Sequence, residues 1–256
     1  VAAAGHDRKL RIYSLKDKKE VATIDLGRIA YQMGIAFGPK GERVYIAGAD
    51  GLIRRRQVSG GKDASGLGER AALRCAAIAP DGRAVVAGDA DGRVRLWRVD
   101  APAEPRMLWD DARAVRAMAW SPDGARVAAS ANDVLRVWRV GEGPQDGPTW
   151  KGGGKPLHLR WTADGQSLIA AADNGRVLRY ALDGGGEPEV LARSAGGTVR
   201  GGGVSRGGWA ACVAVQNYVD FYAARAGRRV GTARVGGRIR WALTPNGQFA
   251  VSDAGQ

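Results

Sequence analysis

Two turn signals return along the whole chain at a nearly constant spacing, and this repeat restricts the fold more than any other feature. The glycine of the first turn recurs after 41, 42, 41, 43 and 39 residues, at Gly41, Gly82, Gly124, Gly165, Gly208 and Gly247. The second turn keeps the same period, at Asp7, Asp50, Asp91, Asn132, Asn174 and Gln216. A unit repeated in this way buries its apolar faces by stacking on its neighbours.

The clearest copy of the unit, residues 71–99, is predicted to form three short strands joined by two turns. Ala79–Gly82 has Pro at its second position and Gly at its fourth, which predicts a type I turn. Asp91-Gly92 predicts a two-residue hairpin turn, because both residues tolerate positive φ. Ala84–Ala87 is apolar throughout, so we expect it to be buried on both faces. Arg93–Val99 alternates, so we expect it to be only partly buried.

Short motifs of the repeat resemble WD repeats: IAPDG at 78–82, DGRVRLW at 91–97, WSPDG at 120–124, VLRVW at 134–138 and WTADG at 161–165. The resemblance is to divergent, bacterial-type repeats and covers nearly the whole chain. It implies an all-β fold, a β-propeller of four-stranded antiparallel blades that holds protein partners and is not an enzyme. Two features depart from the family. Arg98 and Arg139 replace the aspartate that follows the tryptophan, and no repeat has the Gly-His pair before its first strand.

We expect a single propeller domain over residues 1–256, with blades at about 1–26, 28–67, 71–109, 113–150, 156–192, 198–233 and 238–256. The first and last blades are partial, which favours a seven-bladed parent truncated at both ends. Six blades, with Ile239–Leu243 completing the first, are the alternative. In the fourth blade, Gly141–Pro148 is predicted to be a polar loop before a short outer strand at Thr149–Trp150. Further domains in a full-length chain are compatible with this organisation.

The charge balance favours an anionic partner. Lys and Arg number 39 against 26 for Asp and Glu, which gives a formal net charge of +13. An acidic protein or peptide fits this excess, and nucleic acid is the alternative. A composition rich in Ala, Gly and Arg, as in high-GC genomes, would produce the same excess without any partner.

Few residues suggest chemistry beyond binding. Cys75 and Cys212 lie in apolar strands and are expected to be buried thiols without a disulfide. The sequence has no metal-ligand spacing and no apolar run of about 20 residues, so we expect no metal, no cofactor and no membrane segment. Gly152–Lys155 lacks the strand-to-helix setting and the Ser or Thr of a nucleotide-binding loop.

The candidate binding residues share one position, four residues before the end of each first strand: Met33, Arg74, Arg116, Leu157, Arg200 and Ile239. In propellers the starts of the first strands surround the mouth of the central channel. Arg28, Arg113, Arg238 and His158 are predicted close to the same rim. Convergent arginines favour an acidic peptide, a phosphate group or a nucleic-acid backbone.

Two other interpretations of this rim stay open. The arginines can be solvated or paired, for example with Asp110 and Asp111. An enzyme site at the channel mouth would need His158 among several polar groups.

Overall fold

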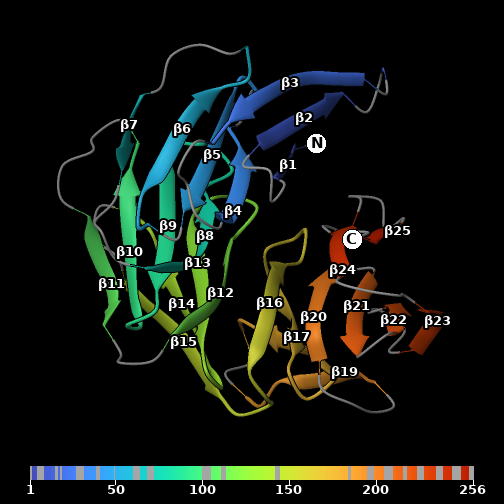
Figure 1. Ribbon diagram of the computed structural model, residues 1–256. Helices are drawn as coiled ribbons and strands as arrows, with labels where there is room; N and C mark the ends of the chain where they lie inside the picture. Colours follow the sequence, from blue (N-terminus) through green and yellow to red (C-terminus); the bar gives the residue numbers. More distant parts are fainter. Residues whose placement is uncertain are drawn as a thin grey trace. The chain divides into compact units, whose positions relative to one another are not determined.

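The protein is built from short antiparallel strands, as shown by a computed structural model (Figure 1). The structure describes residues 2–4, 9–14, 17, 19–26, 32–38, 41–48, 50–59, 64–67, 72–99, 105–110, 114–141, 145–183, 186–194, 199–204, 210–215, 218–223, 228–234, 239–243 and 249–253. None of these residues is helical. The prediction of an all-β fold is therefore confirmed.

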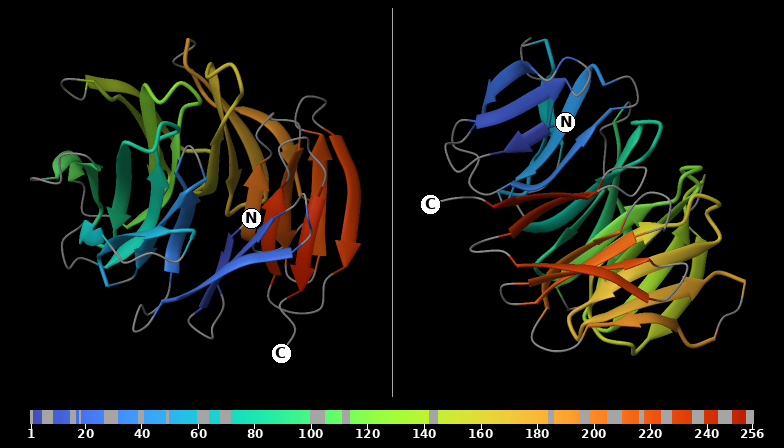
Figure 2. Two further views of the ribbon diagram at one scale, coloured as in Figure 1. Left: turned by 90° about the horizontal axis from the view of Figure 1, so that it is seen from above. Right: turned by 90° about the vertical axis from the view of Figure 1, so that its right-hand side faces the viewer.

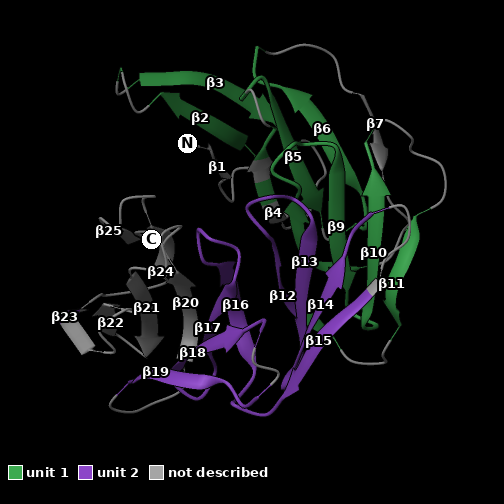
Figure 3. Cartoon of the chain, turned by 180° about the vertical axis from the view of Figure 1, so that it is seen from behind, with its two compact units in different colours: residues 1–115 green, residues 116–256 purple. Residues whose placement is uncertain are grey.

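The chain divides into two compact units, residues 1–115 and 116–256, which we describe separately (Figure 3). Unit 1 contains three sheets, and in each the strands follow chain order. The first sheet has β1 (Ala2–Ala4), β2 (Lys9–Ser14) and β3 (Lys19–Asp25). The second has β4 (Gln32–Phe37), β5 (Arg43–Gly48), β6 (Ile53–Gln57) and β7 (Ala64–Leu67). The third has β8 (Leu73–Ile78), β9 (Ala84–Asp89), β10 (Arg93–Arg98) and β11 (Arg106–Asp110).

Unit 2 contains four sheets with the same chain-order topology. The first has β12 (Val115–Trp120, whose first residue is the last of unit 1), β13 (Arg126–Ala131), β14 (Val134–Arg139) and β15 (Gln145–Lys151). The second has β16 (Pro156–Trp161), β17 (Ser167–Ala172), β18 (Arg176–Ala181) and β19 (Glu189–Arg193). The third has β20 (Val199–Val204), β21 (Ala210–Val215), β22 (Tyr218–Ala223) and β23 (Arg228–Arg234). The last has β24 (Ile239–Leu243) and β25 (Phe249–Asp253).

Within each unit, the first strand of each later sheet lies against the preceding sheet, in most cases against its first strand. In unit 1, β4 lies beside β8, and in unit 2, β16 lies beside β20 and β20 beside β24 (Figure 2). This arrangement agrees with WD-type blades, in which the first strand is the innermost one. Blade number, ring closure and the single domain over residues 1–256 stay predictions.

The apolar middle strands are buried on both faces, as their sequences predict. In β5, Val44 and Ile46 pack with Leu10 and Ile12 of the preceding sheet, whereas Tyr45 packs with the sheet that follows. Each side chain of β5 after Arg43 is therefore enclosed.

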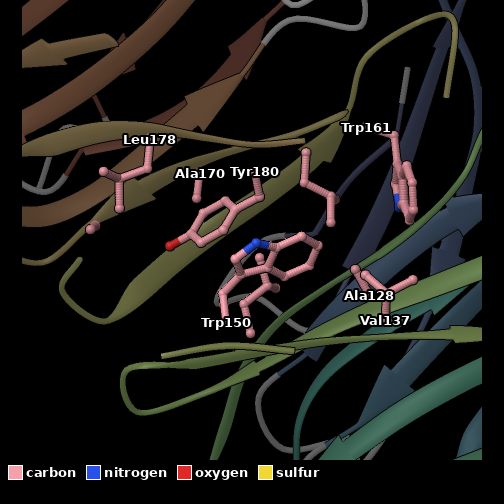
Figure 4. Close-up of a cluster of buried hydrophobic side chains, with 10 residues drawn as sticks. Ala128, Val137, Trp150, Trp161, Ala170, Leu178 and Tyr180 are labelled. Carbon is pink, nitrogen blue, oxygen red and sulfur yellow. The ribbon is translucent and has the colours of Figure 1, made fainter. Parts of the chain in front are cut away.

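In unit 2, a comparable cluster joins the sheets β12–β15 and β16–β19 (Figure 4). There the rings of Trp150 and Tyr180 meet edge to face with their centroids 5.4 Å apart.

The turn predictions are partly right. The amide of Gly82 donates to the carbonyl of Ala79 at 2.8 Å, which closes the predicted first turn. The two-residue turn at Asp91-Gly92 is wrong, because three residues separate β9 from β10 and only Gly92 among them has positive φ. Asp89 causes the difference, since its Oδ1 accepts the amides of Asp91 at 3.0 Å and Arg93 at 2.8 Å.

Two other expectations are corrected. Arg93–Val99 was expected to be only partly buried, yet Val94, Leu96, Trp97 and even Arg95 are buried. The guanidinium of Arg95 reaches Oδ2 of Asp89 at 2.9 Å, so its charge is compensated inside the sheet.

The segment 141–148 was expected to be a loop, but β15 already begins at Gln145. Gln145 and Asp146 pair with Arg139 and Trp138 of β14, and this pairing extends the outer strand.

Every four-stranded sheet has an irregularity between its third and outer strands. In the sheet β8–β11, Leu96 and Arg95 pair with Arg106 and Met107, but Val94 pairs with Trp109, so Leu108 is an extra residue. Corresponding register shifts occur along β7, β15, β19 and β23. Such bulges twist an edge strand and hinder pairing with another chain. The outer edges are therefore poor templates for strand addition.

Candidate functional site

The predicted binding position coincides with a bulge near the start of the first strand. Leu73 pairs with Asp89 and Cys75 with Gly88, so Arg74 is an extra residue on β8. The same register shift places Met33, Leu157 and Arg200 as extra residues on β4, β16 and β20. A bulged residue leaves the regular ladder, and its side chain can be directed independently of the strand. The shared sequence offset therefore corresponds to one repeated structural position.

The arginines at this position differ in what the structure describes. Arg74 and Arg116 are exposed, each as the second residue of its strand, β8 or β12. Arg200 has the same place on β20, but its side chain lies outside the described residues. Ile239 is regularly paired with Asp253 and is not bulged. Arg74 belongs to unit 1 and the other two arginines to unit 2, so their convergence stays a prediction.

The other predicted rim residues are only partly placed. Arg28, Arg113, Arg238 and Asp111 lie outside the described residues. Asp110 ends β11, and its Oδ1 lies 3.5 Å from Nε of Arg93. It therefore faces a third-strand arginine instead of standing as an isolated acid.

His158 lies on β16, immediately after the bulged Leu157, and its side chain is exposed at the surface. The protein packed around the imidazole nevertheless lowers its pKa below the ordinary value, because desolvation disfavours the charged form. His158 is therefore neutral near pH 7 and adds no positive charge to the arginines of the first strands.

A second group of arginines lies on β6, away from the position shared by the first strands. Asp50 accepts hydrogen bonds from both terminal nitrogens of Arg54, at 3.0 and 2.5 Å. This contact lowers the pKa of the Asp50 carboxyl. The pKa of Arg56 is lowered mainly by burial and secondarily by the charge of Arg54. Arg54 and Arg56 share one face of the strand, which concentrates positive charge there.

In the sheet β16–β19, which lacks the Gly-His pair, three hydrogen bonds join the loop before β16 to the turn after β17. Nδ2 of Asn174 donates to the carbonyl of Gly153 at 2.9 Å, and the amide of Lys155 donates to Oδ1 of Asp173 at 2.9 Å. The amide of Asp173 returns a bond to the carbonyl of Lys155 at 3.0 Å. The main chain of the β15–β16 loop is thus tied to the β17–β18 turn through the side chains of Asp173 and Asn174 and the amide of Asp173.

The described residues offer little for catalysis. They contain no group of three or more His, Cys, Asp or Glu side chains placed to hold a metal ion. Cys75 is a free, half-buried thiol, and desolvation raises its pKa to about 12, which leaves it unreactive at neutral pH. The side chain of Cys212 is outside the described residues.

A void of about 10 Å³ between the sheets β4–β7 and β8–β11 is lined by Tyr45 and six aliphatic residues, including Ile35 and Ile78. It has room for about one water molecule, so it is not a ligand pocket. Across the part of the chain that the structure covers, no helix could cross a membrane.

These features define a class: an all-β repeat protein in which four of the described sheets share two bulges, one near the start of the first strand and one between the third and outer strands. The family model WD40 (WD domain, G-beta repeat) matches residues 66–98 and 108–139, and these two matches support a WD-repeat assignment. No curated protein matches the chain. WD40 repeats generally mediate protein–protein interactions as scaffolds, and domains built from them are typically non-catalytic.

Proposed function

We propose that the protein is a non-catalytic scaffold that binds an acidic protein or peptide through the bulged arginines of its first strands. In this proposal the sheets are blades of a β-propeller, with seven blades favoured and six as the alternative. The single observation that supports it most directly is the bulge, because it gives Arg74 and Arg200 an equivalent place outside the regular ladder. Arg116 is exposed at the matching place on β12.

The chemistry of the position suits carboxylates. A guanidinium presents a planar fork of donors that matches a carboxylate group with two hydrogen bonds. His158, whose pKa is lowered, and the aliphatic Leu157 leave the arginines as the charged members of the set. In this proposal, the carboxylates of an acidic segment pair with the arginines at these equivalent positions.

The test measures binding of a short poly-glutamate peptide to the whole chain and to two triple variants. One variant carries Arg74→Ala, Arg116→Ala and Arg200→Ala. The matched control removes three arginines from other strands, with Arg43→Ala, Arg139→Ala and Arg193→Ala. We expect the first variant to lose about tenfold or more in affinity, because charge-assisted hydrogen bonds contribute about 1.5–3 kcal/mol each. Equal losses in both variants would show general charge attraction and would overturn the proposal.

Nucleic acid is the second candidate, and the net charge of +13 is the observation that favours it. A single-stranded DNA oligonucleotide is titrated in parallel at several salt concentrations. Nucleic-acid binding through the basic surface predicts an affinity that falls steeply with salt and weakens alike in both variants. Tighter binding of DNA than of poly-glutamate, with that salt dependence, would replace the scaffold proposal by this one.

A further inference from the structure

The loop between β15 and β16 has an unusual main chain. Gly152, Gly153 and Gly154 follow one another with φ of 86°, 85° and 106°, and Lys151 and Lys155 flank them. Residues that carry a side chain rarely adopt such φ values, so this backbone path depends on glycine. Both lysines are exposed. The loop is therefore a stretch of main chain without side chains, flanked by two lysines.

Two amide groups of this loop have unused donors. The amide of Gly152 donates to the carbonyl of Asp133 at 3.1 Å, and the amide of Lys155 donates to Asp173. No described residue accepts a hydrogen bond from the amides of Gly153 or Gly154. Successive main-chain amides without partners are available to donate hydrogen bonds to an anion, as they do in anion-binding turns.

An independent observation comes from the side chain beneath the loop. Tyr180 is 1% exposed, and among the described residues its hydroxyl has no hydrogen-bond partner. That oxygen lies 3.6 Å from the place where a Cβ on Gly153 would stand. In Figure 4 the ring of Tyr180 lies against Trp150, and its hydroxyl extends past the ring on the side of Leu178.

A buried hydroxyl without a partner is costly, and natural proteins rarely leave one. Desolvation raises the pKa of Tyr180 to about 12, so the hydroxyl keeps its proton and can donate.

We propose that the loop Lys151–Lys155 is a binding site for a phosphate group. The amides of Gly153 and Gly154 and the two lysine ammonium groups supply donors and positive charge around a small oxyanion. The Tyr180 hydroxyl, which lies beside the Cβ position of Gly153 and has no partner among the described residues, is a further donor next to the loop. Nζ of Lys155 also lies 3.9 Å from Oδ2 of Asp173, and this contact positions the ammonium group beside the loop.

This site is separate from the bulged arginines, and its residues do not take part in the acidic-partner proposal. It also differs from a nucleotide-binding loop, since Lys151–Lys155 joins two strands and no helix follows. The phosphate group can come from free phosphate or from a phosphorylated side chain of a partner. Both sources share the chemistry that the loop recognises.

The test follows the amide resonances of Gly153 and Gly154 by NMR in the whole chain during titration with inorganic phosphate. A peptide with one phosphoserine, its unphosphorylated form and acetate are titrated in parallel. We expect saturable shifts of both glycine amides with phosphate and none with the unphosphorylated peptide or acetate. Tighter binding of the phosphopeptide than of phosphate identifies a modified partner as the source, and the reverse identifies the free ion.

Three variants make the result decisive. Lys151→Gln with Lys155→Gln should weaken phosphate binding about tenfold or more, whereas the matched pair Lys9→Gln with Lys19→Gln should leave it unchanged. Tyr180→Phe removes only the hydroxyl, and we expect a several-fold loss of phosphate affinity in a fully folded chain. Glycine amides that do not shift, or equal affinities for phosphate in all three variants and the wild type, would overturn the proposal. Unchanged affinity in Tyr180→Phe alone would remove the hydroxyl from the site.

Discussion

Two neighbouring sheets of unit 1 are built on one plan but hold their third strands in different ways. In the sheet β8–β11, Trp97 pairs with Val85 and is 3% exposed. In the sheet β4–β7, Arg56 pairs with Val44 at the corresponding place and is half-buried.

The ion pair of the sheet β8–β11 is likewise more deeply buried than the ion pair of the sheet β4–β7. Asp89 and Arg95 are enclosed, at 0% and 6% exposure, whereas the side chains of Asp50 and Arg54 are 33% and 21% exposed. One plan thus supports either a sheet with a buried aromatic residue and ion pair or a sheet whose charged residues are partly exposed. The energetic contributions of equivalent positions should differ accordingly.

The largest effect is expected at the aromatic position. Trp97→Ala should lower the free energy of unfolding by ~3–5 kcal/mol, because it leaves a cavity between two packed sheets. Arg56→Ala should cost about 1 kcal/mol or less, since solvent reaches its site. Urea unfolding followed by tryptophan fluorescence and by circular dichroism measures both. Similar losses in the two variants would mean that the sheets do not differ in packing at this position.

The two ion pairs provide the second comparison. Asp89→Ala leaves the Arg95 guanidinium buried without its partner and should cost ~3–5 kcal/mol. Asp50→Ala removes an exposed pair and should cost about 1 kcal/mol or less. Because the charge of Arg95 causes the larger loss, adding Arg95→Met to Asp89→Ala should recover part of the stability. No recovery in that double variant would place the role of Asp89 in the turn amides instead.

These two sheets also show which features a sequence can predict. The turn at Ala79–Gly82 and the apolar strand β9 depend on local residue types, and both were predicted. The burial of Arg95 was not, because alternation indicates a half-exposed strand and the compensating carboxylate belongs to the preceding strand. A pattern of single residues cannot show that Asp89 turns inward. The three-residue turn was missed for the same reason.

The candidate site divides in a similar way. A constant offset from the end of the first strand grouped Arg74 and Arg200 correctly at one structural position. Their bulge was not predicted, since it depends on two residues facing one on the next strand. The loop at Gly152–Gly154 was considered only as a nucleotide-binding motif. Its free amides and the unpartnered Tyr180 hydroxyl depend on hydrogen bonds that only the structure shows.

Glycine positions test how tightly each sheet is packed. A Cβ on Gly88, in β9, would stand 2.5 Å from Cβ and Cγ1 of Val115. Gly88→Ala should therefore cost ~1–3 kcal/mol through overpacking. Gly38→Ala, directly after β4 of the neighbouring sheet, should cost less, because the atom nearest to its added Cβ, Cε2 of Tyr45, would be at an ordinary 3.5 Å. Thermal unfolding of the two variants measures the difference, and a larger loss for Gly38→Ala would reverse the assigned order of packing.

The smallest expected effect is the acid sensitivity of the open sheet. The hydrogen bond from Arg54 lowers the pKa of Asp50 below the ordinary 3.8 in the folded chain. As pH falls, the unfolded chain therefore binds this proton first, so the contribution of Asp50 is present above about pH 4 and disappears below it. This contribution to the free energy of unfolding should be under ~1 kcal/mol, because solvent screens the pair.

Asp50→Asn should remove this part of the pH dependence of stability. The remaining pH dependence, to which Asp123 and Asp164 contribute through their lowered pKa values, should persist in the variant. Free energies of unfolding for both proteins between pH 7 and pH 3 give a difference curve that should narrow on acidification. A difference that widens would mean that the pair with Arg54 does not stabilise the folded sheet.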